Sequence, residues 1–329
     1  MDVLIYLSAL AAGFALIVFG ADRFVTGAAA TACNYGISPL VIGLTIVGLG
    51  TSAPEILIAV QASLNGNTAL AMGNAIGSNI TNITLIVGVT AVIVPLRVKS
   101  EILKREFPIL FAVTLLVMVL ISDGTLGRID GVLMLSGLAI MLYWVTVMAR
   151  SGRKDDPIDA EYEAEIPKNL SNVMAIFWLL VGMVILIGSS KLLVWGAVKL
   201  ATLMGVSELV IGLTIIAIGT SLPELAASVM SAIKKEPDIA IGNVIGSNMF
   251  NLLAVMCVPG LLRPGGIEPA LLSRDYLIMV ILTLVLFAMA YGFKGPGKVN
   301  RLEGALLLVF FVAYQLLLYY YKGTSLSLS

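Results

Sequence analysis

Two related stretches, GTSAPE at residues 50–55 and GTSLPE at residues 219–224, each place a proline and a glutamate inside a long apolar run. Proline lacks the backbone donor of a helix interior, and its ring crowds the carbonyl oxygen four residues earlier. A carboxylate inside a membrane segment is costly and is usually retained for function. We therefore expect each stretch to interrupt a helix and to contribute to a site, and the repetition indicates two related halves of the chain.

The composition indicates a membrane protein with several spanning helices. Of the 329 residues, 59% are hydrophobic and 12% are charged, and the mean hydropathy is +1.02. A soluble domain carries about 25% charged residues. Apolar segments long enough to cross a bilayer recur from end to end, so the chain should lie in the lipid bilayer. The formal net charge of zero gives no reason to expect a nucleic-acid partner.

Several kinds of chemistry are excluded by what the sequence lacks. It has no histidine, which removes histidine zinc sites, Ser-His-Asp triads and histidine proton relays. It also has no HExxH or GxSxG motif, so we expect neither an enzyme nor a bound cofactor. Cys33 and Cys257 form no CxxC pattern and are interpreted as free thiols. Asp2, where a signal peptide has a basic region, favours a first membrane helix.

Polar, glycine and proline clusters divide the chain into ten predicted transmembrane helices, an all-α fold. Their expected ranges are residues 3–32, 38–63, 69–95, 107–122, 128–149, 172–202, 207–233, 239–262, 275–292 and 301–321. The hydrophilic segment 150–171 is interpreted as a linker between two five-helix halves, residues 1–149 and 172–329.

The distribution of basic residues predicts how this bundle is oriented, because cytoplasmic loops are enriched in Lys and Arg. The loops after the third, fifth, seventh and ninth predicted helices carry 13 Lys and Arg, and the opposite side carries 4. This difference predicts that the linker 150–171 is cytoplasmic and that both termini lie outside.

An internal repeat relates the two halves. Residues 38–83 and 207–252 align without a gap at an offset of 169, with 22 of 46 positions identical. Five predicted helices separate equivalent points, and because five is odd the second copy enters the membrane upside down. Inverted repeats of this kind are typical of secondary transporters, whose site lies at the membrane midplane between the repeats.

The first motif of each repeat offers oxygen ligands. Pro54 should break the helix near Gly50, so that freed carbonyls and the Thr51 and Ser52 hydroxyls lie beside Glu55. The predicted broken helices are the second and seventh. The second copy repeats the set as Gly219, Thr220, Ser221, Pro223 and Glu224.

The second motif of each repeat is GNAIGSN at residues 73–79 and GNVIGSN at residues 242–248. A spacing of four residues places a polar stripe on one helix face. The stripe consists of Asn74, Ser78 and Asn82, and again of Asn243, Ser247 and Asn251. Asn82 and Asn251 are expected to bind ions at the midplane, and Asn74 and Asn243 to support the site, with interhelical hydrogen bonding as the alternative. Asn79 and Asn248, one position off the stripe, are expected to cap or buttress the broken helices.

Carboxylates, hydroxyls and carbonyls together suit hard cations such as Ca²⁺ or Na⁺. One Ca²⁺ neutralises Glu55 and Glu224, and so do two Na⁺ or two protons. A site that is neutral when loaded and charged when empty is penalised for crossing the low-dielectric membrane unloaded. The charge count therefore favours obligate exchange, with the site exposed to each side in turn.

These paired motifs resemble those of the calcium/cation antiporter superfamily, specifically the prokaryotic sodium/calcium exchanger type. The resemblance implies ten transmembrane helices, a prokaryotic cytoplasmic membrane, function as a monomer, and exchange of Ca²⁺ for Na⁺. It implies that Glu55 and Glu224 are the principal Ca²⁺ ligands and that Thr51 and Thr220 contribute largely through backbone oxygen. It also implies that the helices over residues 3–32 and 172–202 slide across the bundle. The remaining ligands would be Ser52, Ser78, Ser221, Ser247, Asn82 and Asn251.

One departure concerns Asn251, where prokaryotic members of this type can have Asp. Asn cannot ionise, so the site holds at most two negative charges, which leaves the counter-ion and its stoichiometry open. A Ca²⁺/H⁺ or other divalent-cation/H⁺ antiporter is the alternative function, and a cation channel is a more distant one.

Overall fold

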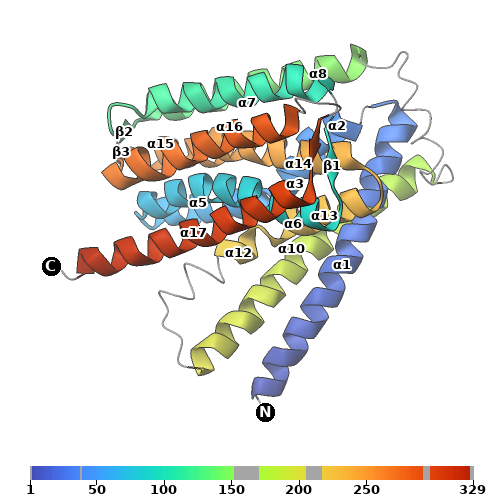
Figure 1. The fold of residues 1–329 in the computed structure, drawn as a ribbon, viewed down its shortest axis with the longest axis horizontal. Helices are drawn as coiled ribbons and strands as arrows, with labels where there is room; N and C mark the ends of the chain where they lie inside the picture. The colour runs from blue at the N-terminus through green and yellow to red at the C-terminus, as the bar shows by residue number, and fades with distance from the viewer. Residues whose placement is uncertain are drawn as a thin grey trace.

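The computed structural model describes residues 2–37, 39–98, 100–151, 170–204, 217–291 and 297–326, and these residues are mostly helical (Figure 1). Within them, seven helices are long and apolar enough to cross a membrane, or eight if the bent pair Gly43–Thr51 and Ala53–Leu64 is one span. The seven are Val3–Tyr35, Thr68–Ile93, Arg128–Val145, Asn172–Leu203, Pro237–Leu262, Leu271–Tyr291 and Arg301–Leu318. The prediction of a helical membrane protein is therefore confirmed. The linker 150–171 lies almost wholly outside the described residues.

The first half begins with the long helix α1 (Asp2–Tyr35), followed by a run of short helical pieces. The helices of this half after α1 are α2 (Pro39–Ile42), the π-helix η1 (Gly43–Val47), α3 (Gly48–Thr51), α4 (Ala53–Leu64), α5 (Thr68–Thr81), the π-helix η2 (Asn82–Ile86), α6 (Val87–Ile93), α7 (Ser100–Leu120) and α8 (Arg128–Ser151).

The described part of the second half follows a similar order. Its helices are α10 (Asn172–Leu203), α12 (Ala217–Thr220), α13 (Leu222–Ile233), α14 (Pro237–Phe250), the π-helix η4 (Asn251–Val255), α15 (Cys257–Leu262), the π-helix η5 (Leu271–Tyr276), α16 (Leu277–Tyr291) and α17 (Arg301–Leu326).

Two small antiparallel ladders between loops were not predicted, so the chain is not strictly all-α. Strand β1 (Leu96–Arg97) pairs with β4 (Lys298–Val299), and β2 (Thr125–Leu126) pairs with β3 (Gly265–Gly266). Each ladder joins a loop of the first half to a loop of the second. Two-residue strands leave no periodicity in a sequence, and only the meeting of distant loops creates them.

The centre of the molecule is formed by α5–η2–α6 and α14–η4–α15. In the apolar 18-residue stretch of each of these two spans, 72% and 89% of the residues are buried, against 22% in the corresponding stretches of α1 and α17. The main apolar core surrounds them and includes Phe107, Phe250 and Tyr276. The two spans that carry the second motif therefore lie where lipid does not reach.

Helices α1 and α10 pack against each other and extend away from the remaining helices (Figure 1). Glycines allow the close crossing: a Cβ added at Gly13 would lie 2.6 Å from Leu193 Cγ, and one at Gly182 would lie 2.4 Å from Phe24 N. Gly182 and Leu193 are the positions 169 residues after Gly13 and Phe24, so the same contact occurs twice.

The helical run that contains the first proline changes direction at Ser52. The axes of Gly43–Thr51 and Ala53–Leu64 differ by 47°, and Pro54 stands in the first turn of α4. In the second half, Ser221 separates α12 from α13, and Pro223 again stands in the first turn. Proline is tolerated in a first turn because those positions need no backbone donor.

Candidate ion site

The two halves contribute to one buried centre through contacts that cross between them. Segment α3 contacts α14 and α12 contacts α5, while α4 contacts η4 and α13 contacts η2. Each pair joins the first motif of one half to the second motif of the other. The structure thus brings together the segments that hold the predicted residues of both motifs, which are Gly50, Thr51, Ser52, Pro54, Glu55, Asn74, Ser78 and Asn82, with Gly219, Thr220, Ser221, Pro223, Glu224, Asn243, Ser247 and Asn251.

Both glutamates are buried at this centre. Glu55 is 1% exposed and Glu224 is 2% exposed. The Glu224 carboxyl lies within electrostatic reach of Glu55 and of the Thr51 and Ser52 hydroxyls in the opposite half. No basic side chain is among these partners, so the two acids are not a structural salt bridge with Lys or Arg.

Six buried oxygens at this centre have no hydrogen-bond partner of standard geometry among the described residues. They form three repeat-related pairs: Oγ of Ser52 and Ser221, Oε2 of Glu55 and Glu224, and Oδ1 of Asn82 and Asn251. Buried polar atoms are nearly always hydrogen-bonded, so each exception needs an explanation. Oxygens that the protein leaves without hydrogen-bond partners are available as ligands for a hard cation.

The amides of Asn82 and Asn251 are held by asparagines of the opposite half. Asn82 Nδ2 donates to Asn248 Oδ1 at 3.0 Å, and Asn251 Nδ2 donates to Asn79 Oδ1 at 3.0 Å. Since the nitrogen is engaged in each case, the amide oxygen is the atom left for a ligand. Both asparagines also begin a π-helix, η2 or η4, and π-helical turns are frequent at functional sites.

Asn79 and Asn248 make hydrogen bonds that the sequence did not predict. Their side chains accept hydrogen bonds from the polar stripe of the other half, and their expected role beside the broken helices stays a prediction. Asn79 Nδ2 also donates to the Asn248 carbonyl at 3.2 Å. The available signal was their repetition in both GSN triplets, because helical spacing alone puts them off the stripe.

Asn74 and Asn243 hold the backbone of the glutamates. Asn74 Nδ2 donates to the Glu55 carbonyl at 3.4 Å, and Asn243 Nδ2 donates to the Glu224 carbonyl at 3.2 Å. These contacts are interhelical hydrogen bonds, the alternative that the sequence left open for both residues. They fix the position of each glutamate without using its carboxylate.

The Thr51 hydroxyl is engaged in protein contacts. Its oxygen lies 3.0 Å from the Val47 carbonyl oxygen and 3.1 Å from Asn243 Oδ1, two acceptors that share its one proton, and 3.4 Å from Ser247 Oγ. Ser78 and Ser247 are buried one helical turn before Asn82 and Asn251. The hydroxyl of Thr51 thus links the first motif of one half to the stripe of the other.

The donor set is rich in oxygen and poor in charge. In the part of the chain that the structure describes, no three Cys, Asp or Glu side chains gather in one metal-binding group. Two carboxylates surrounded by hydroxyl and amide oxygens suit Na⁺ or Ca²⁺ better than a transition metal.

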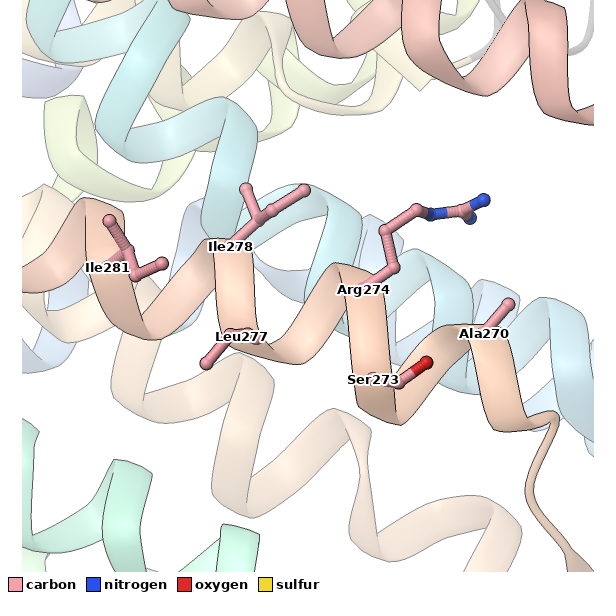
Figure 2. Close-up of a pocket in the computed structure, with 6 residues that line it drawn as sticks. All are labelled: Ala270, Ser273, Arg274, Leu277, Ile278 and Ile281. Carbon is pink, nitrogen blue, oxygen red and sulfur yellow. The ribbon is translucent and has the colours of Figure 1, made fainter.

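A pocket of about 410 Å³ lies elsewhere, along η5 and α16 (Figure 2). It is lined by Ala270, Ser273, Arg274, Leu277, Ile278 and Ile281. None of these residues belongs to the buried polar centre. Arg274 is already paired with Asp275, at 2.8 Å from Nε to Oδ1.

A helical membrane fold with a buried, oxygen-lined centre shared by two related halves defines a membrane transport protein for small cations. The sodium/calcium exchanger protein family matches residues 5–147 and 174–320. The chain belongs to this family of exchangers.

Individual relatives agree over nearly the whole chain. The CaxA protein of Alkalimonas amylolytica is 47% identical over 307 residues, covering 93% of this chain and 96% of the relative. The inner membrane protein YrbG of Escherichia coli is 39% identical, covering 94% and 95%. A solved structure of the sodium-calcium exchanger NCX_Mj is 31% identical with a TM-score of 0.80, covering 94% of this chain and 97% of that one.

Proposed function

We propose that this chain exchanges Ca²⁺ for Na⁺ across a membrane by exposing one buried site to the two sides in turn. The observation that carries the proposal is the set of six buried oxygens in three repeat-related pairs, one pair of which, Oε2 of Glu55 and Glu224, belongs to carboxylates. The family membership and the likeness to a solved exchanger support the same ions.

The layout proposed for this function is ten transmembrane helices in two inverted five-helix repeats, residues 1–149 and 172–329, joined by a cytoplasmic linker at 150–171. The repeats at 38–83 and 207–252 would each supply one broken helix, the second and the seventh. The crossed contacts Asn82–Asn248 and Asn251–Asn79 support this layout, because they follow the symmetry of the repeat.

In the proposed site, Glu55 and Glu224 are the principal ligands, and Ser52, Ser221, Asn82 and Asn251 supply neutral oxygens. The backbone oxygens of Thr51 and Thr220 and the hydroxyls of Ser78 and Ser247 complete the cation positions. Gly50, Gly219, Pro54 and Pro223 shape the helix breaks, and Asn74 and Asn243 support the glutamates.

Charge balance makes the exchange obligatory. The empty site carries up to two negative charges in a centre that is shielded from water, and such charges are strongly unfavourable in a low-dielectric medium. Either one Ca²⁺ or two Na⁺ removes the net charge. The protein can therefore change conformation when loaded with either ion, whereas the empty form is held back.

We further propose that the protein lies in a prokaryotic cytoplasmic membrane and works as a monomer, with both termini outside. The excess of basic residues on the linker side supports this orientation. The description of YrbG as an inner membrane protein supports the location.

The experiment is calcium uptake into proteoliposomes driven by an outward Na⁺ gradient, with K⁺ on both sides as the control. We expect rapid uptake that stops when the Na⁺ gradient is collapsed. Uptake that follows an imposed proton gradient and ignores Na⁺ would replace the proposal with Ca²⁺/H⁺ exchange. Uptake that requires no counter-gradient would indicate a channel.

A further inference from the structure

We propose that Ser190 and the ion pair Asp22–Lys234 are positioning residues that bias the transport cycle toward the conformation described above. Both contacts tie the α1–α10 pair to the second half of the bundle, and the sequence cannot form their counterparts with the first half. The inference rests on the proposed exchange by alternating access, which requires one part of the molecule to move relative to another.

The first contact involves the backbone oxygen that Pro223 leaves without its helical donor. That oxygen belongs to Gly219, four residues before the proline, where an amide hydrogen would otherwise bond. Ser190 Oγ donates to it at 2.6 Å. Ser190 is 5% exposed and lies on α10, so a buried hydrogen bond joins this helix to the interrupted segment α12.

The second contact is an ion pair between α1 and the end of α13. Lys234 Nζ lies 2.7 Å from Asp22 Oδ1. Arg23, the next residue on α1, has its guanidinium carbon 4.8 Å from the ring centre of Trp178 on α10. Position 22 therefore belongs to a section of α1 that is fixed against α10, and the ion pair acts on the two helices together.

Neither contact has a counterpart in the repeat. The position 169 residues before Ser190 is Ala21, which has no hydroxyl to donate to the carbonyl of Gly50. The counterparts of Asp22 and Lys234 are Lys191 and Asn65, which cannot form an ion pair. If the two halves exchanged their conformations, both contacts would break and no equivalent contacts would replace them.

The packing of the α1–α10 pair is compatible with such movement. Its apolar contacts form a cluster separate from the main core, and small residues such as Ala21, Ala28 and Ala29 make up much of it on α1. Small side chains interlock less deeply than large ones, so a surface made of them resists sliding less. Two specific polar contacts can then determine which conformation the α1–α10 pair favours.

The test compares four variants of the full chain. Ser190→Ala removes the hydroxyl, Lys234→Gln removes the ion pair, and Ala21→Ser adds a hydroxyl at the equivalent position of the other half. Ser189→Ala is the matched control, because among the described residues Ser189 Oγ bonds within its own helix, to the Leu186 carbonyl at 3.0 Å.

The readout is the distance distribution between spin labels at Val184→Cys on α10 and Ile129→Cys on α8, both lipid-exposed positions, in a background without Cys33 and Cys257. Pulsed electron paramagnetic resonance in detergent, with Na⁺ and without Ca²⁺, reports the two conformations independently of transport. We expect Ser190→Ala and Lys234→Gln each to shift the ratio of populations by about fivefold away from the conformation described above and toward the one in which the two halves have exchanged conformations. A change of this size is the effect of losing one hydrogen bond or one exposed ion pair. Ala21→Ser should shift the ratio the same way.

Identical distributions in Ser190→Ala, Ala21→Ser and the unaltered chain would overturn the inference, even if sodium-driven calcium uptake is intact. An equal shift in Ser189→Ala would also overturn it, because that change removes no interhelical contact. A chain that shifts as expected but transports no calcium would contradict the proposed function and leave the positioning role supported.

Discussion

At the scale of single residues, the candidate site depends on which atom of each side chain is left free. The amides of Asn82 and Asn251 expose only their oxygens because asparagines of the opposite half hold their nitrogens. Asn74 and Asn243 hold the glutamate backbone and leave the carboxylates unengaged by those contacts. Hydrogen bonds to the proposed ligands therefore shape the candidate site as much as the proposed ligands themselves do.

Replacing either buried carboxylate should abolish calcium transport. In Glu55→Gln or Glu224→Gln the site keeps its size and loses one of two negative charges, and we expect Ca²⁺ uptake to fall at least about a hundredfold. Uptake into proteoliposomes measures this, and gel filtration reports folding. Glu268→Gln, at an exposed glutamate, is the control and should transport normally. Normal uptake by both site variants would refute the assignment of the glutamates.

Asn251→Asp should make exchange depend on pH. A protonated Asp can still donate to Asn79 Oδ1, as the amide does at 3.0 Å. When pH rises and the carboxyl ionises, that bond is lost and a third negative charge enters the site. We expect the ratio of Na⁺ to Ca²⁺ transported, or the rate of Ca²⁺ uptake, to change with pH in the variant more than in the unaltered chain. Matching pH profiles would argue that Asn251 is only structural.

The sequence predicted most of the residues that the structure gathers at this centre, but it did not predict the hydrogen bonds that join them across the two halves. Spacing of four along a helix finds Asn74, Ser78 and Asn82 because they share a face of one helix. The bond between Asn82 and Asn248 joins two helices 166 positions apart. No local pattern encodes that contact, and only the repeat hinted that both GSN triplets matter.

At the scale of helices, close approach at glycine positions the motif segments. A Cβ at Gly246 on α14 would lie 2.5 Å from the Leu44 carbonyl oxygen of η1, closer than real Cβ contacts occur. Glycine at position 246 permits this approach because it carries no side chain. The π-helical form of η1 could not be predicted, because no local pattern in Gly43–Val47 distinguishes a π-helical turn from an ordinary helical turn.

Gly246→Ala should therefore force α14 and η1 apart. The methyl group meets backbone and not a flexible side chain, so we expect a loss of about 1–3 kcal/mol in stability together with reduced calcium uptake. Thermal unfolding in detergent measures the first effect. Gly188→Ala is the matched control, since among the described residues nothing lies within 4 Å of its added Cβ. A Gly246→Ala protein as stable and active as this control would contradict the packing argument.

At the scale of the whole molecule, the repeat relates contacts that are far apart in the chain. The same offset of 169 connects the glycine contacts of α1 with α10, the crossed asparagines and the paired free oxygens. Composition was enough to predict a helical membrane protein, and the odd number of helices between the repeats predicted inversion. Contacts that depart from the repeat, such as the hydrogen bond from Ser190 to Gly219, could not be predicted from the composition or from the repeat.

The inverted arrangement makes a direct prediction about sidedness. Ser122 follows α7, and Lys298 lies in the β4 strand after α16, in loops that the repeat makes equivalent. If the second half is upside down, the two loops lie on opposite sides, and the excess of basic residues places Lys298 inside. In a background without Cys33 and Cys257, Ser122→Cys should react with a membrane-impermeant thiol reagent in intact cells. Lys298→Cys should react only after permeabilisation, and labelling of both from outside would rule out inversion.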